Sequence, residues 1–483
     1  MTRPSAAGPD WSNRAEEVGW WFGGSILGPT RRFAAAIIIT AGPWLVAVAA
    51  LAVITTSMLP VLGKSALEDL NLSVIYAFCL APLVAGPIGA VAARMVRRAV
   101  EESAGRLVSE IFLTAAIAAG LLTQALAIIL CMALGIAPLG IAVALIFLAV
   151  SAALLWVGFA VLCAFRSYGV LIAAFSAGMA LSVACTMLAA RVQPTVEMLV
   201  WSFSAGLSLT IALFFLHAFR RFGRSSADLS VAALRLKAEL WRSRILVISV
   251  LVAICGVWAD KWFFWFGPLG VQSSAGFLHY PPYDSVMFLA HLSIVPTFAS
   301  MLLFQDHDIE AAIAVFRRSL KDNATHAVIR ETVDRLGSVV LSGVLRIAFV
   351  QGVVTSGLVL MSPLLSETLA FSFRQLLLLQ VALIAVYLQS LFYLAGSILV
   401  LCSQSRLFAL VQLLFLMTNL IGSFAFFSTM GVSAYAIFSA SLVCAVVTLL
   451  LAFRSLRLYD YLVFVGENDS LYPDHPGQQP TSK

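Results

Sequence analysis

Apolar runs long enough to cross a lipid bilayer recur along the whole sequence, and no other feature constrains the fold as strongly. Of the 483 residues, 61% are hydrophobic and only 11% are charged, whereas a soluble protein of this length needs a far more polar surface. A transmembrane helix needs about 20 mostly apolar residues. The sequence therefore predicts an all-α polytopic membrane protein with about twelve transmembrane helices, at residues 33–59, 71–93, 109–134, 141–164, 169–190, 196–218, 245–267, 284–304, 339–361, 376–400, 407–429 and 434–453.

The basic residues are distributed unevenly between the two sides of these helices. If the N-terminus is cytoplasmic, 25 of the 30 lysines and arginines fall on the cytoplasmic side, and only Lys64, Arg191 and Arg374 fall on the opposite side. Short cytoplasmic loops of membrane proteins are enriched in Lys and Arg. The sequence therefore predicts a multi-pass membrane protein with both termini in the cytoplasm. This distribution also explains the net charge of +6, and we predict no nucleic-acid partner.

The predicted helices divide into two bundles of six. A cytoplasmic N-terminal tail at 1–32 precedes the first bundle at 33–218, and a basic cytoplasmic linker at 219–244 joins it to the second bundle at 245–453. The chain ends in a cytoplasmic tail at 454–483. We expect the two bundles to be the structural units of the fold.

A charged cytoplasmic loop at 305–338 interrupts the second bundle. Its Ile309, Ile313, Phe316 and Leu320 are spaced alternately by four and three residues, which is the pattern of an amphipathic helix. Such a helix could lie on the inner face of the membrane, or it could be a connector whose apolar side packs against the bundle. Either arrangement leaves the loop accessible to a cytoplasmic partner.

We find no enzyme signature in the sequence. Gly63-Lys64-Ser65 resembles the end of a phosphate-binding loop, but residue 58 is Met where that motif requires Gly. The six histidines are not clustered, and the seven cysteines lie in apolar runs without paired metal-ligand spacing. We therefore predict a protein that is not an enzyme and that has no cofactor and no metal site. A membrane acyltransferase that uses His291 is the enzymatic alternative.

The helix predicted at 245–267 carries an adjacent acid and base, Asp260 and Lys261. Asp260 lies roughly 22 Å into a hydrocarbon core of about 30 Å, where ionisable groups are costly and mark pathways or paired sites. Neighbouring helical residues point about 100° apart, so we expect each to need another partner: Asp284 for Lys261 and His291 for Asp260. An Asp260–His291 relay could couple transport to protons. The structural alternatives are a buried pair, or a Lys261 that extends outward to the interface.

Three tryptophans follow the same helix at i, i+4 and i+7: Trp258, Trp262 and Trp265. They form one helical stripe, which is typical of an aromatic belt at a membrane interface. The alternative is a stacking surface for the apolar faces of sugar rings. Polar amides within the spans would suit a hydroxyl-rich cargo or helix–helix packing, and they are Gln124, Gln351, Gln380, Gln389, Gln412 and Asn419.

The first predicted helix contains Ala41-Gly42-Pro43-Trp44 about ten residues after its start. Pro43 removes a backbone hydrogen bond and Gly42 loosens the turn, so we expect a bend near the membrane midplane. The equivalent helix of the second bundle carries Asp260 and Lys261. Irregular positions at the start of both halves are typical of a central transport pathway.

These segments resemble the PelG family, the inner-membrane exporters of Pel exopolysaccharide. The resemblance is carried by Ala41-Gly42-Pro43-Trp44, by Asp260-Lys261-Trp262 with Phe264-Trp265-Phe266, and by Tyr283-Asp284-Ser285 followed by Met287-Phe288-Leu289-Ala290. The family's usual Gly-Ile-Gly-Phe-Glu-Leu-Arg opening is replaced here by Gly19-Trp20-Trp21-Phe22-Gly23-Gly24, and the acidic-aromatic start of its inner loop by Gln305-Asp306-His307-Asp308-Ile309.

The resemblance implies a fold of the multidrug/oligosaccharidyl-lipid/polysaccharide flippase superfamily, with two six-helix bundles in a V around a central cavity. It also implies a partly deacetylated amino-sugar polymer as substrate. A cytoplasmic glycosyltransferase and membrane-bound partners of a Pel-type synthase complex would be its partners.

From these features we expect a transporter that moves an exopolysaccharide or a lipid-linked glycan from the cytoplasm to the periplasm. The candidate pathway residues are Gly42, Pro43, Trp44, Trp258, Asp260, Lys261, Trp262, Trp265, Asp284 and His291. An ion-coupled exporter of small compounds is the alternative within transport. A membrane scaffold that recruits a polysaccharide synthase is the alternative from another class.

Overall fold

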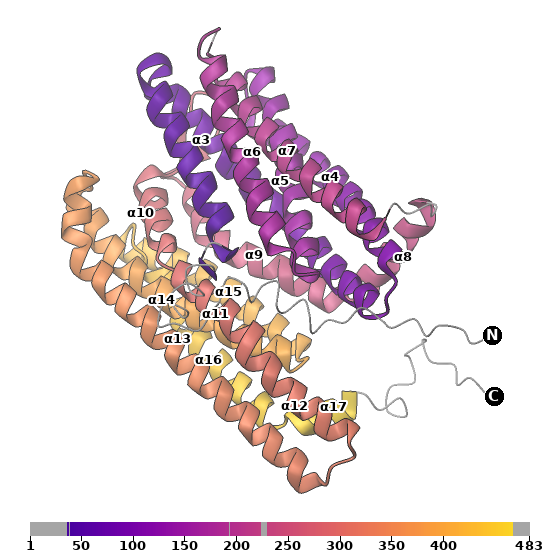
Figure 1. The fold of residues 1–483 in the computed structure, drawn as a ribbon. Helices are drawn as coiled ribbons and strands as arrows, with labels where there is room; N and C mark the ends of the chain where they lie inside the picture. Colours follow the sequence, from indigo (N-terminus) through magenta and orange to yellow (C-terminus); the bar gives the residue numbers. More distant parts are fainter. Residues whose placement is uncertain (1–35, 38, 193, 224–228, 467–483) are drawn as a thin grey trace, which may run out of the picture.

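A computed structural model describes residues 36–37, 39–192, 194–223 and 229–466 (Figure 1). The predicted N-terminal tail at 1–32 and the end of the C-terminal tail at 467–483 lie outside the described residues. The fold is all-α apart from one short hairpin, and its elements are α3 (Gly42–Glu101), α4 (Gly105–Leu134), α5 (Leu139–Ala164), α6 (Tyr168–Ala189), α7 (Val196–Phe222), α8 (Leu229–Arg242), α9 (Arg244–Trp265), β1 (Val271–Gln272), β2 (Leu278–His279), α10 (Pro281–Leu292), α11 (Val295–Leu303), the π-helical turn η1 (Phe304–Ile309), α12 (Glu310–Lys321), α13 (His326–Thr368), α14 (Phe373–Leu401), α15 (Ser405–Met430), α16 (Tyr435–Arg457) and α17 (Tyr459–Gly466).

Helix α3 contains two membrane crossings. Its 60 residues are interrupted at Gly63, whose φ of 78° lies in the left-handed region that glycine adopts readily. The Thr55 hydroxyl donates to the Asn71 side-chain oxygen at 3.5 Å, although these residues would be about 24 Å apart on a straight helix. The chain therefore folds back at Gly63. Eleven helical segments of the described chain are long and apolar enough to cross a membrane, and with α3 counted as two crossings they agree with the twelve predicted.

The helices form two lobes arranged as a V (Figure 1). The first lobe contains α3 to α7, whose core is lined by residues such as Leu145, Leu148 and Phe214. The second lobe contains α10 to α17, with cores around Phe392 and Tyr283. The predicted all-α, two-bundle architecture is therefore confirmed.

Helix α9 lies between the lobes and packs closely against both. On the side of the first lobe, a Cβ at Gly86 of α3 would come within 2.7 Å of Ile254. On the side of the second lobe, a Cβ at Gly256 would come within 2.9 Å of Phe415 in α15, and the Asn419 amide donates to the Gly256 carbonyl at 3.0 Å. Small residues thus let α9 approach both lobes, as is common where membrane helices pack.

The two ends of the molecule differ in chemistry. The linker that contains α8 lies at one end, together with the last turn of α3 at Arg98, the loop at Arg166 and the first turns of α13 at Arg330. We call this end the basic end. The β1–β2 hairpin lies at the opposite end of α9 from α8, and we call this the hairpin end. These two names are used below.

The charged loop at 305–338 forms a helix at Glu310–Lys321 (α12). Its Ile309 and Phe316 are buried in the second-lobe core, and the Phe316 ring lies 5.2 Å from that of Tyr459 in α17. Its apolar side therefore packs on the bundle, which supports the connector interpretation over a helix lying on the membrane. The start of this loop forms η1, and its end from His326 onward belongs to α13, which thus begins thirteen residues before the predicted start of its span.

Helices α6 and α7 cross at a pair of glycines. A Cβ at Gly178 would lie 2.0 Å from the Thr210 hydroxyl and 2.4 Å from the Gly206 carbonyl oxygen. The Ser182 hydroxyl donates to the Phe203 carbonyl across the same interface at 3.2 Å. The backbones can approach this closely only because neither residue at the crossing has a side chain.

This crossing predicts that Gly178→Ala destabilises the protein, because the added methyl group forces the two helices apart. Overpacking of this kind costs about 1–3 kcal/mol, so we expect a lower midpoint of thermal unfolding in detergent. Gly169→Ala is the matched control on the same helix, since a Cβ there meets no atom within 4 Å. Equal midpoints for the two variants would contradict the prediction.

Candidate functional site

Asp260 and Lys261 form a buried ion pair on α9. The Asp260 side chain is fully buried and that of Lys261 is 13% exposed. The Lys261 ammonium lies 3.5 Å from both carboxylate oxygens and also donates to the Val257 carbonyl at 3.1 Å. We expected Lys261 to need another charged partner, and this was wrong, because it pairs with Asp260 as in the buried-pair alternative. The two Cα–Cβ bonds do diverge, but the long lysine side chain folds back along the helix and over the Trp258 ring.

Two further donors reach the Asp260 carboxylate from other helices. The Tyr283 hydroxyl of α10 donates to it at 2.6 Å, and the Asn419 amide of α15 donates at 3.4 Å. Both Tyr283 and Asn419 are fully buried. We call Asp260, Lys261, Tyr283 and Asn419 the Asp260 cluster. Because its members come from α9, α10 and α15, the hydrogen bonds to the Asp260 carboxylate connect these three helices.

His291 does not pair with Asp260 as predicted. Its Nδ1 donates to the Met287 carbonyl at 2.7 Å, one turn earlier on α10. Its buried Nε2 has no hydrogen-bond partner among the described residues. The same is true of the side-chain oxygen and nitrogen of the buried Gln389 and of the side-chain oxygen of Asn419. A direct Asp260–His291 hydrogen bond is therefore not formed, and the partner that α10 provides to the carboxylate is the Tyr283 hydroxyl. The orphaned atoms lie on three of the helices that surround the cluster.

Asp284 also has a different partner from the one predicted. Its carboxylate accepts two hydrogen bonds from the Trp265 indole N–H, at 2.9 and 3.0 Å, and one from the Tyr280 backbone N–H at 3.0 Å. Lys261 is instead bonded to Asp260. Asp284 therefore fixes the orientation of Trp265 and the start of α10, rather than compensating the charge of Lys261.

The tryptophan stripe packs against the first lobe. Trp265 is 2% exposed and stacks on Tyr76 of α3 at 5.1 Å, while Trp258 meets Trp265 edge-on at 5.9 Å. Trp258 and Trp262 are partly buried against the first-lobe core. The stripe is therefore a contact between lobes, an arrangement that neither the belt nor the sugar-stacking interpretation predicts. Trp265 is too buried to stack on a sugar in this conformation.

Gly42 and Pro43 are buried at the point where the regular helix α3 begins. The residues just before them are helical as well, and the Ala41 N–H donates to the Ile37 carbonyl at 2.9 Å. Pro43 occupies the first turn of α3, where its missing N–H costs little. The Gly-Pro pair therefore marks a new helix start within the first span. The Trp44 side chain lies outside what the structure describes.

The β1–β2 hairpin attaches the second half of the chain to the first lobe. The two strands pair antiparallel, with Val271 opposite His279. Phe277, next to β2, is fully buried in the first-lobe core. The Tyr76 hydroxyl donates to the Leu278 carbonyl at 2.6 Å. The hairpin is thus held by apolar and polar contacts with the other lobe.

Two acids of α3 complete this attachment. The buried Asp69 accepts hydrogen bonds from the Ser274 hydroxyl and from the Ala275 backbone N–H, the latter at 3.2 Å. Glu68 lies 2.7 Å from the His279 Nε2. We call the hairpin with Glu68, Asp69 and Tyr76 the interlobe clasp. Sequence reasoning missed it, although two adjacent acids beside an apolar span were a signal that could have been followed.

The basic end is joined more loosely. An ion pair links Arg166 of the first lobe to Glu310 of α12, with side chains 57% and 50% exposed. Exposed ion pairs of this kind contribute about 0–1 kcal/mol. The clasp, by contrast, contains the buried residues Phe277 and Asp69, and the buried Trp265 of α9 stacks on its Tyr76. Within the described residues, the lobes are therefore tied more firmly at the hairpin end than at the basic end.

A cavity of about 430 Å³ lies beside the middle of α9 and extends toward the basic end, where Val400 and Phe408 lie near the ends of α14 and α15. Its lining combines apolar residues with a phenol, a hydroxyl and two amides, and comprises Ala253, Ile254, Val257, Gln305, Tyr393, Ser397, Val400, Phe408 and Gln412. Val257 connects the two sites, because its side chain lines the cavity and its carbonyl accepts from Lys261. The cavity suits neutral polar groups that hydrogen-bond and stack.

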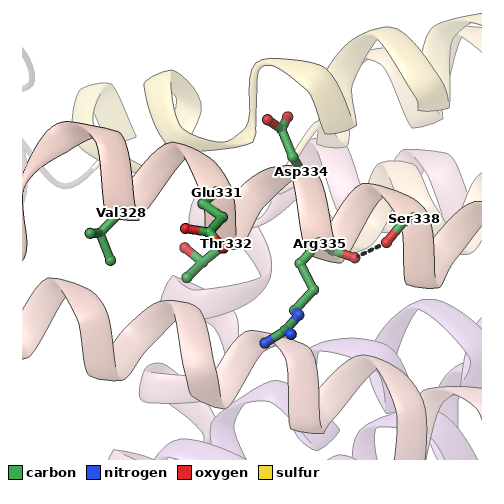
Figure 2. A pocket seen from close by; sticks show the side chains of 6 residues that line it. All are labelled: Val328, Glu331, Thr332, Asp334, Arg335 and Ser338. Carbon is green, nitrogen blue, oxygen red and sulfur yellow. Dashed lines mark hydrogen bonds between the residues drawn. The ribbon is translucent and has the colours of Figure 1, made fainter.

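A second cavity lies on α13 near the basic end (Figure 2). Its volume is about 480 Å³, and all of its lining comes from one helix, through Val328, Glu331, Thr332, Asp334, Arg335 and Ser338. A groove on the side of a single helix cannot form a route between lobes. The described residues contain no group of three or more His, Cys, Asp or Glu side chains that could hold a metal ion.

The fold is that of known transporters. A crystal structure of MATE in complex with MaD3S has a TM-score of 0.61 and 15% identity, and the match covers 90% of this chain and 97% of that one. The outward-facing conformation of a multidrug resistance MATE family transporter of the MOP superfamily has a TM-score of 0.60 and 14% identity, with 89% and 96% covered. A variant of the Vibrio cholerae MATE transporter VcmN has a TM-score of 0.61 and 14% identity, with 94% and 99% covered.

No curated protein sequence matches this chain significantly. A family model does match, over residues 23–464, and its description is PelG, "Putative exopolysaccharide Exporter (EPS-E)". This range covers nearly every described helix, and it confirms the resemblance found in the sequence. This multi-pass membrane protein, with its two-lobed transporter fold, therefore belongs to the PelG family.

Proposed function

We propose that this protein moves an exopolysaccharide, a Pel-like amino-sugar polymer, across the bacterial inner membrane from the cytoplasm to the periplasm. The family and the fold indicate a transporter rather than an enzyme. The uneven distribution of basic residues supports a cytoplasmic basic end and cytoplasmic termini. A cytoplasmic glycosyltransferase and membrane partners of a Pel-type synthase complex would deliver the polymer to that end.

The observation that carries this proposal is the asymmetry along α9. The interlobe clasp joins the lobes at the hairpin end of α9, while the polar-aromatic cavity extends from the middle of α9 toward the basic end. A carrier that alternates between two open states needs a tight contact at one end and an accessible site toward the other. The conformation described here fits a state that accepts cargo from the basic end.

The Asp260 cluster would link the cavity to the clasp. Lys261 bonds to Val257 on the cavity side, and Trp265 bonds to Asp284 next to the hairpin. A rotation of α9 that opens the clasp would therefore disturb the cluster. In this proposal the candidate residues Gly42, Pro43 and Trp44 bend the first span alongside α9. Trp258 and Trp262 would move with the lobe contact.

An ion-coupled exporter of small compounds is the second candidate. It is favoured by the orphaned acceptor atoms of His291, Gln389 and Asn419, because a protonated water molecule or a small cation could bind to them. In that case the Asp260 cluster would be a coupling site. The scaffold alternative would instead place the activity on the exposed face of α12 and α13 at the basic end.

We predict that the double variant Asp260→Asn with Lys261→Gln reduces polysaccharide secretion about tenfold or more. Hydrogen bonds to charged groups contribute about 1.5–3 kcal/mol, and about 1.4 kcal/mol corresponds to a tenfold change. Removing both charges together avoids leaving one of them buried alone. Secreted and intracellular polysaccharide would be measured in cells, with the amount of protein in the membrane determined in parallel.

The control for this experiment is the double variant Asp334→Asn with Arg335→Gln on α13, which removes the same two charges from an exposed surface. Tyr283→Phe provides a milder test, because it removes one hydroxyl and keeps the ring. Normal secretion by the Asp260 variants at normal abundance would make the cluster purely structural. Normal secretion after deletion of the whole protein would exclude the exporter function.

A disulfide across the clasp should stop transport. The hydroxyl oxygens of Ser65 and Ser274 are 3.1 Å apart, so Ser65→Cys with Ser274→Cys places two thiols close enough for a bond. The bond would form spontaneously if the hairpin end faces the oxidising periplasm, and it would hold the lobes together. We expect secretion to fall by at least about tenfold and to recover when a reductant is added.

Each single cysteine variant is the control for this cross-link. Secretion at the normal rate by fully cross-linked protein would show that the clasp does not need to open. If the disulfide does not form in growing cells but forms rapidly after cell lysis in an oxidant, the hairpin end faces the reducing cytoplasm. The orientation of the protein in the membrane would then be the opposite of the proposed one.

A further inference from the structure

Helix α8 joins the two halves of the chain and lies outside the transport site. Its 14 residues are too few to cross a bilayer, which takes about 20. Figure 1 shows it at the basic end beside the first lobe. Only the buried Ser243 separates it from α9, whose apolar span starts at Arg244. The C-terminal end of α8 is therefore held at the boundary of the membrane.

One face of α8 is fixed against the first lobe. Ala232 and Leu236 are buried, with exposed fractions of 4% and 3%. Glu239 pairs with Arg98 of α3 at 3.0 Å, and Arg235 pairs with the largely buried Glu110 of α4 at 3.4 Å. These contacts determine which side of α8 faces away from the protein.

The opposite face is apolar and exposed. Val231, Leu234, Ala238 and Trp241 follow one another at steps of three, four and three residues, so they form one stripe on the helix. Leu234 is 65% exposed and Trp241 is 73% exposed. We call these four residues the α8 stripe. An apolar stripe of this width on a short helix would be costly in water.

Basic residues flank the α8 stripe on both sides. At 100° per residue, Arg235 and Arg242 lie along one edge and Lys237 along the other. The one acid of α8, Glu239, is turned toward Arg98 of the first lobe. The outward side of α8 is thus apolar in the middle and positively charged at its edges. Trp241 has the Arg244 guanidinium 5.9 Å from its ring, and tryptophan is enriched where the polar and apolar regions of a bilayer meet.

We propose that α8 lies in the plane of the basic-end leaflet and binds anionic phospholipids. The α8 stripe would enter the region between headgroups and acyl chains, and Arg235, Lys237 and Arg242 would contact headgroup phosphates. Helices with this distribution of charge and apolar surface bind membranes that contain acidic lipid. Because α8 is attached to the first lobe by Glu239 and Arg235, the lipid contact anchors that lobe while the second lobe moves.

Photo-crosslinking of the full-length protein tests this proposal. The photoreactive amino acid benzoylphenylalanine replaces Trp241 in the α8 stripe, or Ala233 as a control on the same helix off the stripe. Each protein is reconstituted into nanodiscs of phosphatidylcholine alone or of phosphatidylcholine with phosphatidylglycerol. We expect lipid adducts at 241, detected by mass spectrometry, that increase with phosphatidylglycerol, and few adducts at 233.

The charge requirement is tested with Lys237→Gln and Arg242→Gln. Each basic residue near an anionic surface contributes about 1 kcal/mol, so we expect the yield of phosphatidylglycerol adducts to fall about fivefold for each residue removed. The control is Lys64→Gln with Arg374→Gln, which removes the same charge at the hairpin end.

Three outcomes would overturn the proposal. Equal adduct yields in the two lipid compositions would exclude recognition of anionic headgroups. An absence of lipid adducts at 241 in protein that runs as a single folded species would place the stripe in water. Crosslinking of 241 to another protein in intact cells, in place of lipid, would identify the stripe as a protein-binding surface. None of these readouts depends on polysaccharide secretion, so the proposal stands or fails separately from the proposed function.

Discussion

A carboxylate inside the hydrocarbon region of a membrane is stable only if donors replace the water it has lost. Asp260 obtains those donors from three places: Lys261 on its own helix, Tyr283 on α10 and Asn419 on α15. Each donor is itself held by a packed helix, so the position of α9 relative to its neighbours is fixed by one buried charge. Because α9 also contacts the first lobe, the geometry of the lobe interface depends on this cluster.

The interface between the lobes combines rigid and breakable contacts. Tyr76 stacks on Trp265 and also holds the hairpin through the Leu278 carbonyl, so one α3 side chain serves both the aromatic contact and the clasp. Asp69 and Glu68 add hydrogen bonds that water or another acceptor can replace. Contacts of this kind can separate and reform without unfolding either lobe, which a carrier with alternating access requires.

Several features of this protein follow from local chemistry and were predictable. The spans follow from apolar runs, because the backbone in lipid must satisfy its own hydrogen bonds. The amphipathic spacing of Ile309 and Phe316 predicted a helix, and a helix is present at Glu310–Lys321. The acid and base at 260 and 261 were identified as the unusual residues of the chain. The family was recognisable from a few motifs around these positions, and the family model confirms it.

The partners of those residues could not be predicted in the same way. The sequence gives the direction of a Cβ but not the rotamer of a long side chain, so the return of Lys261 to Asp260 was missed. Depth along a helix suggested His291 and Asp284, whereas the rotation and tilt of α10 bring Tyr283 to Asp260 and Trp265 to Asp284. The clasp joins residues about 200 positions apart in the sequence. Such pairings cannot be predicted from the local pattern of apolar and charged residues.

The sequence by itself determined that this chain spans a membrane many times, that its basic residues gather toward one side, and that Asp260 and Lys261 are the exceptional charges. It could do so because burial cost and helix periodicity are local properties of a chain in lipid. Only the tertiary structure decided which groups compensate the Asp260 charge, at which end the two lobes are held together more firmly, and which face of α8 is left uncovered. Those outcomes depend on how whole helices rotate and pack against one another. That packing is determined jointly by many residues that are distant from one another in the sequence.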